Sequence, residues 1–220
     1  MNETIFALHI TEGIFPPKWA ALWFIIALPF VTWGLHDLKV KSLRMPAFKL
    51  LVGLVGAAIF VISCMPIPIP GTGTCSHPAG AGIGAILIGA PVTVVVSSIA
   101  LLLQALFLAH GGLSTLGGNL VAMGIAGAFS GGAVFWSARK IGFPAWFSAF
   151  LCGAISHWAA YATTAFMLAS ALPSDVSLLK MFAGIGVALM PTQIPLGILE
   201  GVLTAAVYQF IRTRRPELIT

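Results

Sequence analysis

Long apolar stretches, separated by short polar or glycine-rich segments, occupy most of this chain. Seven of them stand out, at residues 19–35, 50–67, 79–90, 92–109, 120–136, 143–172 and 181–211. A helix that crosses a membrane needs about 20 mainly apolar residues, and most of these stretches approach or exceed that length. The pattern therefore predicts an all-α, polytopic membrane protein with about seven transmembrane helices.

The third stretch, residues 79–90, is short for a crossing. As a helix it would rise only about 18 Å, whereas the apolar bilayer core is about 30 Å thick. It is either a crossing or a re-entrant piece, and the basic residues between the stretches distinguish the two. If it crosses, nine Lys and Arg residues share one side and two lie opposite; if it does not, the division is five against six.

Basic residues favour the cytoplasmic side of a membrane, so the uneven division is the expected one. Seven crossings then place the N-terminus outside and the C-terminus in the cytoplasm. We expect residues 1–18 to form an extracytoplasmic N-terminal segment with a metal ligand, 19–211 a single transmembrane domain, and 212–220 a basic cytoplasmic tail. The nine residues on the cytoplasmic side are Lys39, Lys41, Arg44, Lys49, Arg139, Lys140, Arg212, Arg214 and Arg215, and the two opposite are Lys18 and Lys180.

Composition supports a membrane location. Of the 220 residues, 59% are hydrophobic and only 8% are charged, against roughly 25% charged residues in ordinary soluble domains. The 11 basic and 6 acidic residues are spread between apolar stretches and form no basic stripe, so we expect membrane lipid around the chain and no nucleic-acid partner. The pattern predicts a multi-pass protein of the cell membrane without a nucleotide-binding domain of its own.

Histidines are the first candidates for chemistry. The expected topology places His9 and His77 on the same outer face, and neutral imidazoles are good ligands for cobalt, nickel, copper and zinc. The alternative is that His77 caps a helix and His9 is solvated. His110 begins the next outer loop, where it is either a ligand or a supporting hydrogen-bond donor.

Glu200 is the only carboxylate deep within an apolar stretch. Such a group is costly in a membrane, so it either neutralises a travelling cation or forms a buried hydrogen bond to a neighbouring helix. We expect His157, near the middle of the sixth stretch, to bond a neighbouring helix. No P-loop, His-Glu-x-x-His or Gly-x-Ser-x-Gly motif is present, so the sequence does not indicate an enzyme.

Four ordered motifs resemble the CbiM/NikM family, the substrate-binding S components of cobalt and nickel energy-coupling factor (ECF) transporters. The resemblance extends from about residue 9 to residue 209. It implies capture of Co²⁺ or Ni²⁺ as the transported substrate, with no organic cofactor. It also implies three kinds of partner: a transmembrane ECF coupling subunit, ATP-binding subunits that carry out the ATP hydrolysis, and a small accessory membrane protein. The motifs are HITEGIFPPKW (9–19), CSHPAGAGIGA (75–85), QALFLAHGGLSTLGGN (104–119) and ILEGVLT (198–204).

In that family the metal is held by the N-terminal amine, by the backbone nitrogen and imidazole of the next histidine, and by the histidine of the Cys-Ser-His-Pro loop. The resemblance assigns the two imidazoles to His9 and His77. Nitrogen-rich sites of this kind suit nickel and cobalt, and the sequence does not choose between them. The candidate supporting residues in the same motifs are Cys75, Ser76, His110 and Asn119.

The chain departs from the family pattern at its N-terminus. Eight residues precede His9, so the amine would belong to Leu8, which is internal in this sequence. Residues 1–7 lack the features of a secretory signal. Either they are removed by other processing, or backbone amides, the Cys75 thiolate or a water molecule replace the amine. A second departure is Gln193, where the resemblance leads us to expect histidine.

Two other functions remain alternatives on the sequence alone. The chain is an ion-coupled secondary carrier if Glu200 carries a proton, or a structural membrane subunit if its histidines are not ligands. Imidazole ligation also predicts a pH dependence, because a metal must compete with protons at each ring. With a reference pKa of about 6.5, binding should weaken below about pH 6.5.

Overall fold

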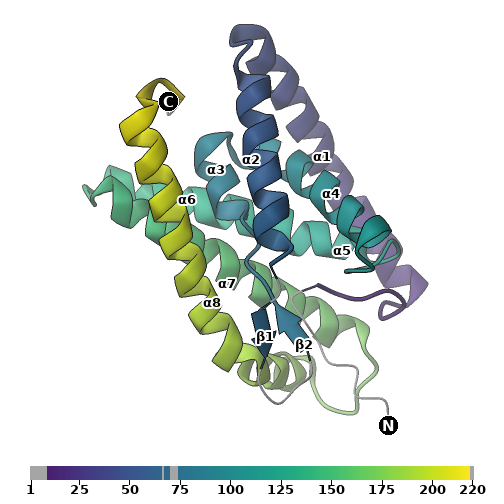
Figure 1. Ribbon diagram of the computed structural model, residues 1–220. Helices are drawn as coiled ribbons and strands as arrows, with labels where there is room; N and C mark the ends of the chain where they lie inside the picture. Colours follow the sequence, from purple (N-terminus) through teal and green to yellow (C-terminus); the bar gives the residue numbers. More distant parts are fainter. Residues whose placement is uncertain (1–8, 66, 70–73, 219–220) are drawn as a thin grey trace.

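The computed structural model describes residues 9–65, 67–69 and 74–218. The described chain is helical apart from one short hairpin, which confirms the predicted all-α membrane fold (Figure 1). The helices are α1 (Pro17–Arg44), α2 (Phe48–Ser63), α3 (Ala81–Leu87), α4 (Ala90–Phe107), α5 (Leu116–Asn119), the π-helix η1 (Leu120–Gly127), α6 (Ala128–Lys140), α7 (Ala145–Ala171), α8 (Leu178–Arg214) and the 3-10 helix η2 (Pro216–Leu218).

The hairpin is a feature that the apolar pattern did not predict. Strand β1 (Ile67–Ile69) pairs antiparallel with β2 (Thr74–Ser76), and Ile67 lies opposite Ser76. The expected second helix, 50–67, therefore ends earlier, at Ser63, and its last residues turn into β1. The hairpin leads the chain directly into His77.

Four helices in the described residues are long and apolar enough to cross a membrane: Pro17–Arg44, Ala90–Phe107, Leu116–Lys140 and Leu178–Arg214. The Leu116–Lys140 span is α5, η1 and α6 in one continuous run. Helices α2 and α7, which were also predicted to cross, are not among these four. Helix α2 has 16 residues and rises about 24 Å, whereas α7 has 27 residues but carries buried polar side chains that lower its mean hydropathy.

The third expected helix, 79–90, is reduced to α3, which has seven residues, all buried. It rises only about 10 Å and lies inside the protein. Residues 77–88 nevertheless carry the chain from one end of the molecule to the other, as a crossing would. The segment starts at His77 and ends near Ile88, whose carbonyl oxygen accepts a hydrogen bond from Lys41 Nζ at 3.1 Å.

Lys41 lies near the end of α1, whereas His9 precedes its start. Residues 77–88 therefore run from the level of His9 to the opposite end of α1, and α4 returns the chain to His110. This path and a direct contact between their rings place His9 and His77 at the same end of the molecule. That this end faces outwards stays a prediction.

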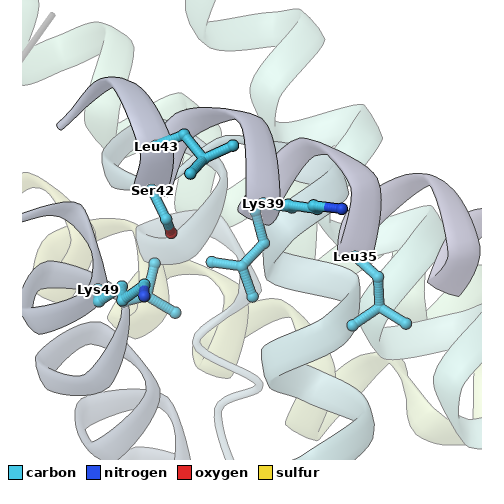
Figure 2. Close-up of a pocket in the computed structure, with 7 residues that line it drawn as sticks. Leu35, Lys39, Ser42, Leu43 and Lys49 are labelled. Carbon is cyan, nitrogen blue, oxygen red and sulfur yellow. The ribbon is translucent and has the colours of Figure 1, made fainter. Parts of the chain in front are cut away.

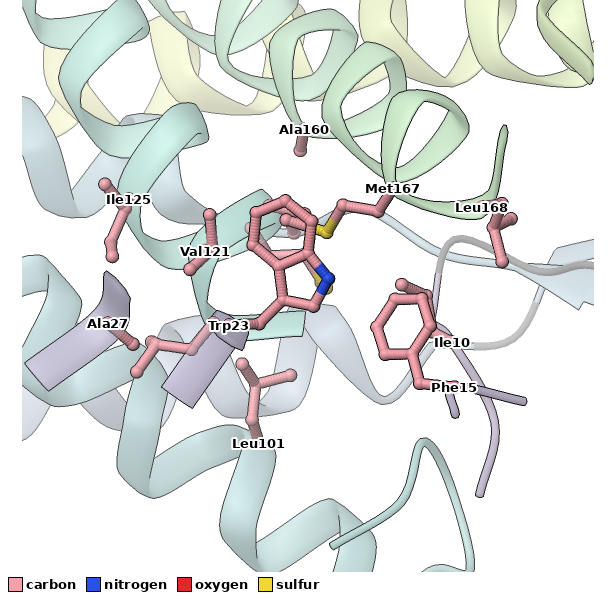
Figure 3. Packing of buried hydrophobic residues seen from close by; sticks show 14 of the residues in the cluster. Ile10, Phe15, Trp23, Ala27, Leu101, Val121, Ile125, Ala160, Met167 and Leu168 are labelled. Atoms are coloured by element: carbon pink, nitrogen blue, oxygen red, sulfur yellow. The ribbon is translucent and has the colours of Figure 1, made fainter. Parts of the chain in front are cut away.

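A hydrophobic core joins the start of the described chain to the helices. Trp23 of α1 packs in a cluster with Leu101 of α4, Val121 of η1 and Met167 of α7 (Figure 3). The same cluster contains Ile10 and Phe15, which precede α1. The segment that carries His9 is therefore anchored by close side-chain packing, and such van der Waals contacts stabilise the association of helices in a membrane.

Candidate metal centre

Three histidine rings from distant parts of the sequence meet in one buried cluster. His9 Nδ1 lies 2.7 Å from His77 Nε2, and His110 Nε2 lies 3.0 Å from the same atom. One ring nitrogen from each of the three residues lies within 4.8 Å of the others. His9 and His77 are 2% and 1% exposed, and His110 is partly buried. The sequence-predicted pair is thus brought together, and His110 completes a set of three.

The backbone next to His9 is clamped by the loop that contains His110. Asn119 Oδ1 accepts a hydrogen bond from the Ile10 amide at 2.8 Å, and Asn119 Nδ2 donates to the Ile10 carbonyl oxygen at 3.0 Å. Thr115 Oγ1 donates to that oxygen at 2.7 Å. The side chain of Asn119 therefore satisfies both backbone polar groups of Ile10, as a neighbouring strand would in a sheet.

A second contact holds the same segment two residues further along, at Glu12. Glu12 accepts a hydrogen bond from the Ser114 amide at 3.1 Å. The Ser114 side chain and then this amide lower the pKa of the Glu12 carboxyl. A Cβ atom on Gly112 would lie 2.8 Å from the Glu12 amide nitrogen. Only glycine fits there, so the two segments lie backbone against backbone.

We expect Asn119→Ala to lower the free energy of unfolding by about 1–3 kcal/mol, because it leaves the buried Ile10 amide without a partner. Thermal unfolding of the metal-free protein in detergent measures this. Thr213→Ala is the control, because the exposed Thr213 hydroxyl donates only to a carbonyl of its own helix. Equal stability of both variants would show that the clamp does not hold residue 10.

The loop around His77 fixes which nitrogen of that ring faces the cluster. His77 Nδ1 lies 3.2 Å from the Pro78 carbonyl oxygen, so we assign the ring proton to Nδ1. The Nε2 lone pair then faces His9 and His110. Metal-binding histidines commonly donate their second ring N–H to a carbonyl in this way, which orients the ligating nitrogen.

Burial keeps the three rings neutral. It lowers the pKa of His77 to about 4, assisted by the neighbouring His110, whereas the hydrogen bond to Pro78 raises it. Burial also lowers the pKa of His9 well below its usual value, with contributions from His77 and His110, and lowers that of His110. Neutral imidazoles are the form that binds transition metals, so the site is prepared for a cation at neutral pH.

The spacing of the rings suits one metal ion. Metal–nitrogen bonds are about 2.0 Å long, so two adjacent ligands at a right angle lie about 2.8 Å apart. The His9 Nδ1 and His77 Nε2 atoms are 2.7 Å apart. Among the described residues, His9 Nε2 is buried without a hydrogen-bond partner, so its ring is held mainly by packing and by the cluster itself.

Of the other residues predicted from the sequence, Ser76 and Asn119 have described side chains, and neither joins the three rings. Ser76 is fully buried but faces Gln193, whose Nε2 donates to Ser76 Oγ at 3.0 Å. The Cys75 backbone belongs to the hairpin, opposite Pro68, and its side chain lies outside the described part of the structure. Leu8 also lies outside the described residues. Asn119 acts on the backbone of residue 10.

Glu200 lies away from the histidine cluster and is fully bonded. Its carboxylate accepts hydrogen bonds from the amides of Ala79 and Gly80, and His157 Nδ1 lies 3.0 Å from Glu200 Oε2. The hydrogen-bonding alternative for Glu200 and the expectation for His157 are therefore both confirmed, since the bond joins α7 to α8. Sequence reasoning missed Thr115, which carries no recognisable signal, and the contact of Gln193 with Ser76.

One groove on the described part of the protein is not part of this site. It has a volume of about 380 Å³ and lies between the second half of α1 and the start of α2 (Figure 2). Apolar side chains line it, together with Ser42 and the amino groups of Lys39 and Lys49. No histidine contributes to it, so the candidate metal centre is the buried cluster.

The fold and the cluster together define a multispanning membrane protein with a buried, nitrogen-rich site. Residues 9–218 match CbiM, described as "Cobalt uptake substrate-specific transmembrane region". The chain belongs to this family, and it is a multi-pass protein of the cell membrane.

Curated relatives and solved structures agree with this assignment. The chain is 51% identical to the cobalt transport protein CbiM of Sorangium cellulosum, over 96% of this chain and 94% of the relative. It is 50% identical to that of Geobacter sulfurreducens, over 97% of this chain and 62% of the relative. A crystal structure of a truncated transition metal transporter shares the fold, with a TM-score of 0.80 at 24% identity, over 93% of this chain and 98% of that one.

Proposed function

We propose that this chain captures Co²⁺ or Ni²⁺ through the imidazoles of His9 and His77, with His110 as a third ligand or a supporting donor. The observation that carries the proposal is the convergence of three neutral imidazoles, two buried and one partly buried, on one point. The neighbouring clamp holds His9 in place, so the ion does not have to organise the site. The names of the relatives, which are cobalt transport proteins, support a metal cargo.

Binding by the purified chain tests this directly. Equilibrium dialysis of the full chain in detergent against CoCl₂ or NiCl₂ should give about one saturable ion per chain, and MgCl₂ should not compete, because magnesium prefers oxygen ligands. Absence of saturable binding of either metal would contradict the proposal. The intact mass of the protein purified from its own cell membrane would show whether Leu8 supplies an amine.

We further propose that the chain is the S component of an ECF transporter. The complete transporter would also contain separate ATP-binding subunits, a coupling subunit and a small accessory membrane protein. The chain itself would then be a transporter subunit and not an enzyme. Metal uptake in cells should require the ATP-binding subunits and should continue when a protonophore dissipates the proton gradient. The reverse result would favour a proton-coupled carrier.

Capture from outside requires the histidine end of the molecule to face outwards. We therefore expect cysteines introduced at Leu43 and Leu113, which are 76% and 50% exposed, to be labelled from opposite sides by a membrane-impermeant maleimide. Leu113, in the loop of His110, should react in intact cells, and Leu43 only in opened membranes. The unsubstituted chain controls for its native cysteines. Labelling of both positions from one side would contradict this orientation.

A further inference from the structure

A chain of buried polar side chains connects α7 and α8 to the loop that carries His77. Glu200 and His157 are 0% exposed, Gln193 is 1% exposed and Ser76 is 0% exposed. His157 lies in α7, and Gln193 and Glu200 lie in α8, two helices that run side by side (Figure 1). Placing four polar groups in the interior is costly unless each one is bonded.

These residues hold the loop on both sides of His77. Before the histidine, Ser76 Oγ accepts a hydrogen bond from Gln193 Nε2 at 3.0 Å. After it, Glu200 Oε2 accepts from the Ala79 amide at 2.8 Å and Glu200 Oε1 from the Gly80 amide at 2.9 Å. Both carboxylate oxygens therefore accept hydrogen bonds from the backbone of the loop that carries His77, residues 76–80, which we call the metal loop.

His157 joins the two ends of this arrangement. Because Gln193 Nε2 donates to Ser76, Gln193 Oε1 is the acceptor that faces His157 Nε2, at 2.9 Å. The other ring nitrogen, Nδ1, lies 3.0 Å from Glu200 Oε2. The hydrogen bonds thus run without a gap from Ser76 through the three side chains to Gly80. We call Gln193, His157 and Glu200 the brace.

The backbone conformation of the metal loop is also restricted at Gly80. Gly80 has a positive φ of 71°, and a Cβ atom there would lie 3.3 Å from Ile59 Cα. The chain must turn at this point in a conformation that suits glycine. The amide of this same residue bonds to Glu200, so the brace fixes the turn that directs the chain from the metal loop into α3.

The two halves of the metal site are anchored independently. His9 is positioned by the loop 110–119 through Asn119 and Thr115, whereas His77 depends on α7 and α8. Among the described residues, the ring of His77 is bonded only to its own neighbour, Pro78, and to the other two histidines. Ligand distances tolerate shifts of only about 0.2 Å, so the backbone position of His77 decides whether the nitrogens match one ion.

We propose that Gln193, His157 and Glu200 are positioning residues for metal binding, which hold residues 76–80 so that His77 Nε2 meets the His9 ring. This inference rests on the proposed function, because it concerns the same metal. None of the three residues touches the ion. They act through the backbone and through Ser76.

The test compares Co²⁺ binding by the full chain in detergent with two variants that break opposite ends of the brace. Glu200→Gln keeps the shape of the side chain but turns one acceptor into a donor that faces a backbone amide. Ser76→Ala removes the acceptor for Gln193 and changes little else. We expect the Kd for Co²⁺ to rise about 10- to 100-fold in each, as is typical when residues around a ligand are lost.

One further readout and a control variant separate positioning from general stability. The visible absorption spectrum of the cobalt-saturated variants should differ from that of the unsubstituted protein, because the His77 nitrogen is displaced. The control is Thr204→Val in α8, because Thr204 is 0% exposed and its hydroxyl has no hydrogen-bond partner among the described residues. It should keep the original Kd and spectrum.

The outcomes are distinct. If the unsubstituted chain binds neither Co²⁺ nor Ni²⁺, the proposed function fails and the brace has no metal to position. If it binds Co²⁺ and both variants keep its Kd and spectrum, even with a lower melting temperature, only the brace proposal is overturned. If Glu200→Gln does not fold, Ser76→Ala alone decides between these results.

Discussion

Replacement of His77 by alanine is expected to abolish saturable cobalt and nickel binding. His77 Nε2 contacts the rings of both His9 and His110, so the variant removes the nitrogen shared by the whole cluster. The Kd should rise beyond about 100-fold, which is the upper limit of the effect when only a supporting residue around a metal is lost. His9→Ala should have an effect of the same size, measured by equilibrium dialysis with CoCl₂ and NiCl₂.

The control is His36→Ala, because His36 is an exposed residue of α1 far along the helix from the cluster. Helical content by circular dichroism and elution as a single species in detergent establish that each variant is folded. His110→Ala separates the two roles left open for that residue, since loss of all binding indicates a ligand and a rise of about 10- to 100-fold a supporting donor. Stoichiometric binding in both His9→Ala and His77→Ala would refute the assignment.

The metal-free protein is expected to lose stability as the pH falls below about 6.5. Burial lowers the pKa of His77, which lies outside the helices, to about 4. In the unfolded chain the same ring has a pKa of about 6.5, so in this window the unfolded state takes up a proton that the folded state excludes. The stabilising contribution is complete above pH 6.5 and is lost as the pH falls towards 4.

The size of this loss depends on the difference in pKa. Each unit corresponds to about 1.4 kcal/mol, so His77 alone accounts for roughly 3 kcal/mol across the window. His9 and His110 act in the same direction, since their pKa values are also lowered. The measurement is thermal unfolding between pH 7.5 and 4.5, and His77→Ala should show a weaker pH dependence than His36→Ala. Equal pH dependence in the two variants would contradict burial of a neutral ring.

Metal affinity should also respond to pH differently from the expectation for solvated imidazoles. Because burial holds the pKa of His9 and of His77 well below 6.5, proton competition at these two rings begins only near the lowered pKa values. Cobalt affinity should therefore change little between about pH 8 and pH 6. A free amine on Leu8, with a reference pKa near 7.7 to 8.0, would instead weaken binding over that range.

Much of the membrane architecture can be predicted from the sequence alone. Apolar stretches of sufficient length predict helices α1, α4 and α8 because a bilayer tolerates only internally bonded backbone. The distribution of Lys and Arg predicts that His9 and His77 share one end, although residues 79–90 are too short for an ordinary crossing. Both results depend on local composition, which a single sequence contains.

The sequence was less informative where distant segments meet. It predicts neither the hairpin before His77 nor the reduction of the third helix to α3, because the segment is buried by neighbours and not by lipid. It names Glu200 as a costly group, but the partners of its carboxylate are 120 and 121 residues away in the chain. Only folding shows that these partners belong to the metal loop.

The sequence by itself thus determined the class of protein, the long apolar helices α1, α4 and α8, and the residue types able to bind a metal. The tertiary structure decided that His110 joins His9 and His77, that the three rings are neutral, and that separate anchors hold them. The physical reason is that the charge state of an imidazole and the distance between two ligands depend on burial and on contacts across 33 residues or more. Neither quantity is a property of any local stretch of sequence.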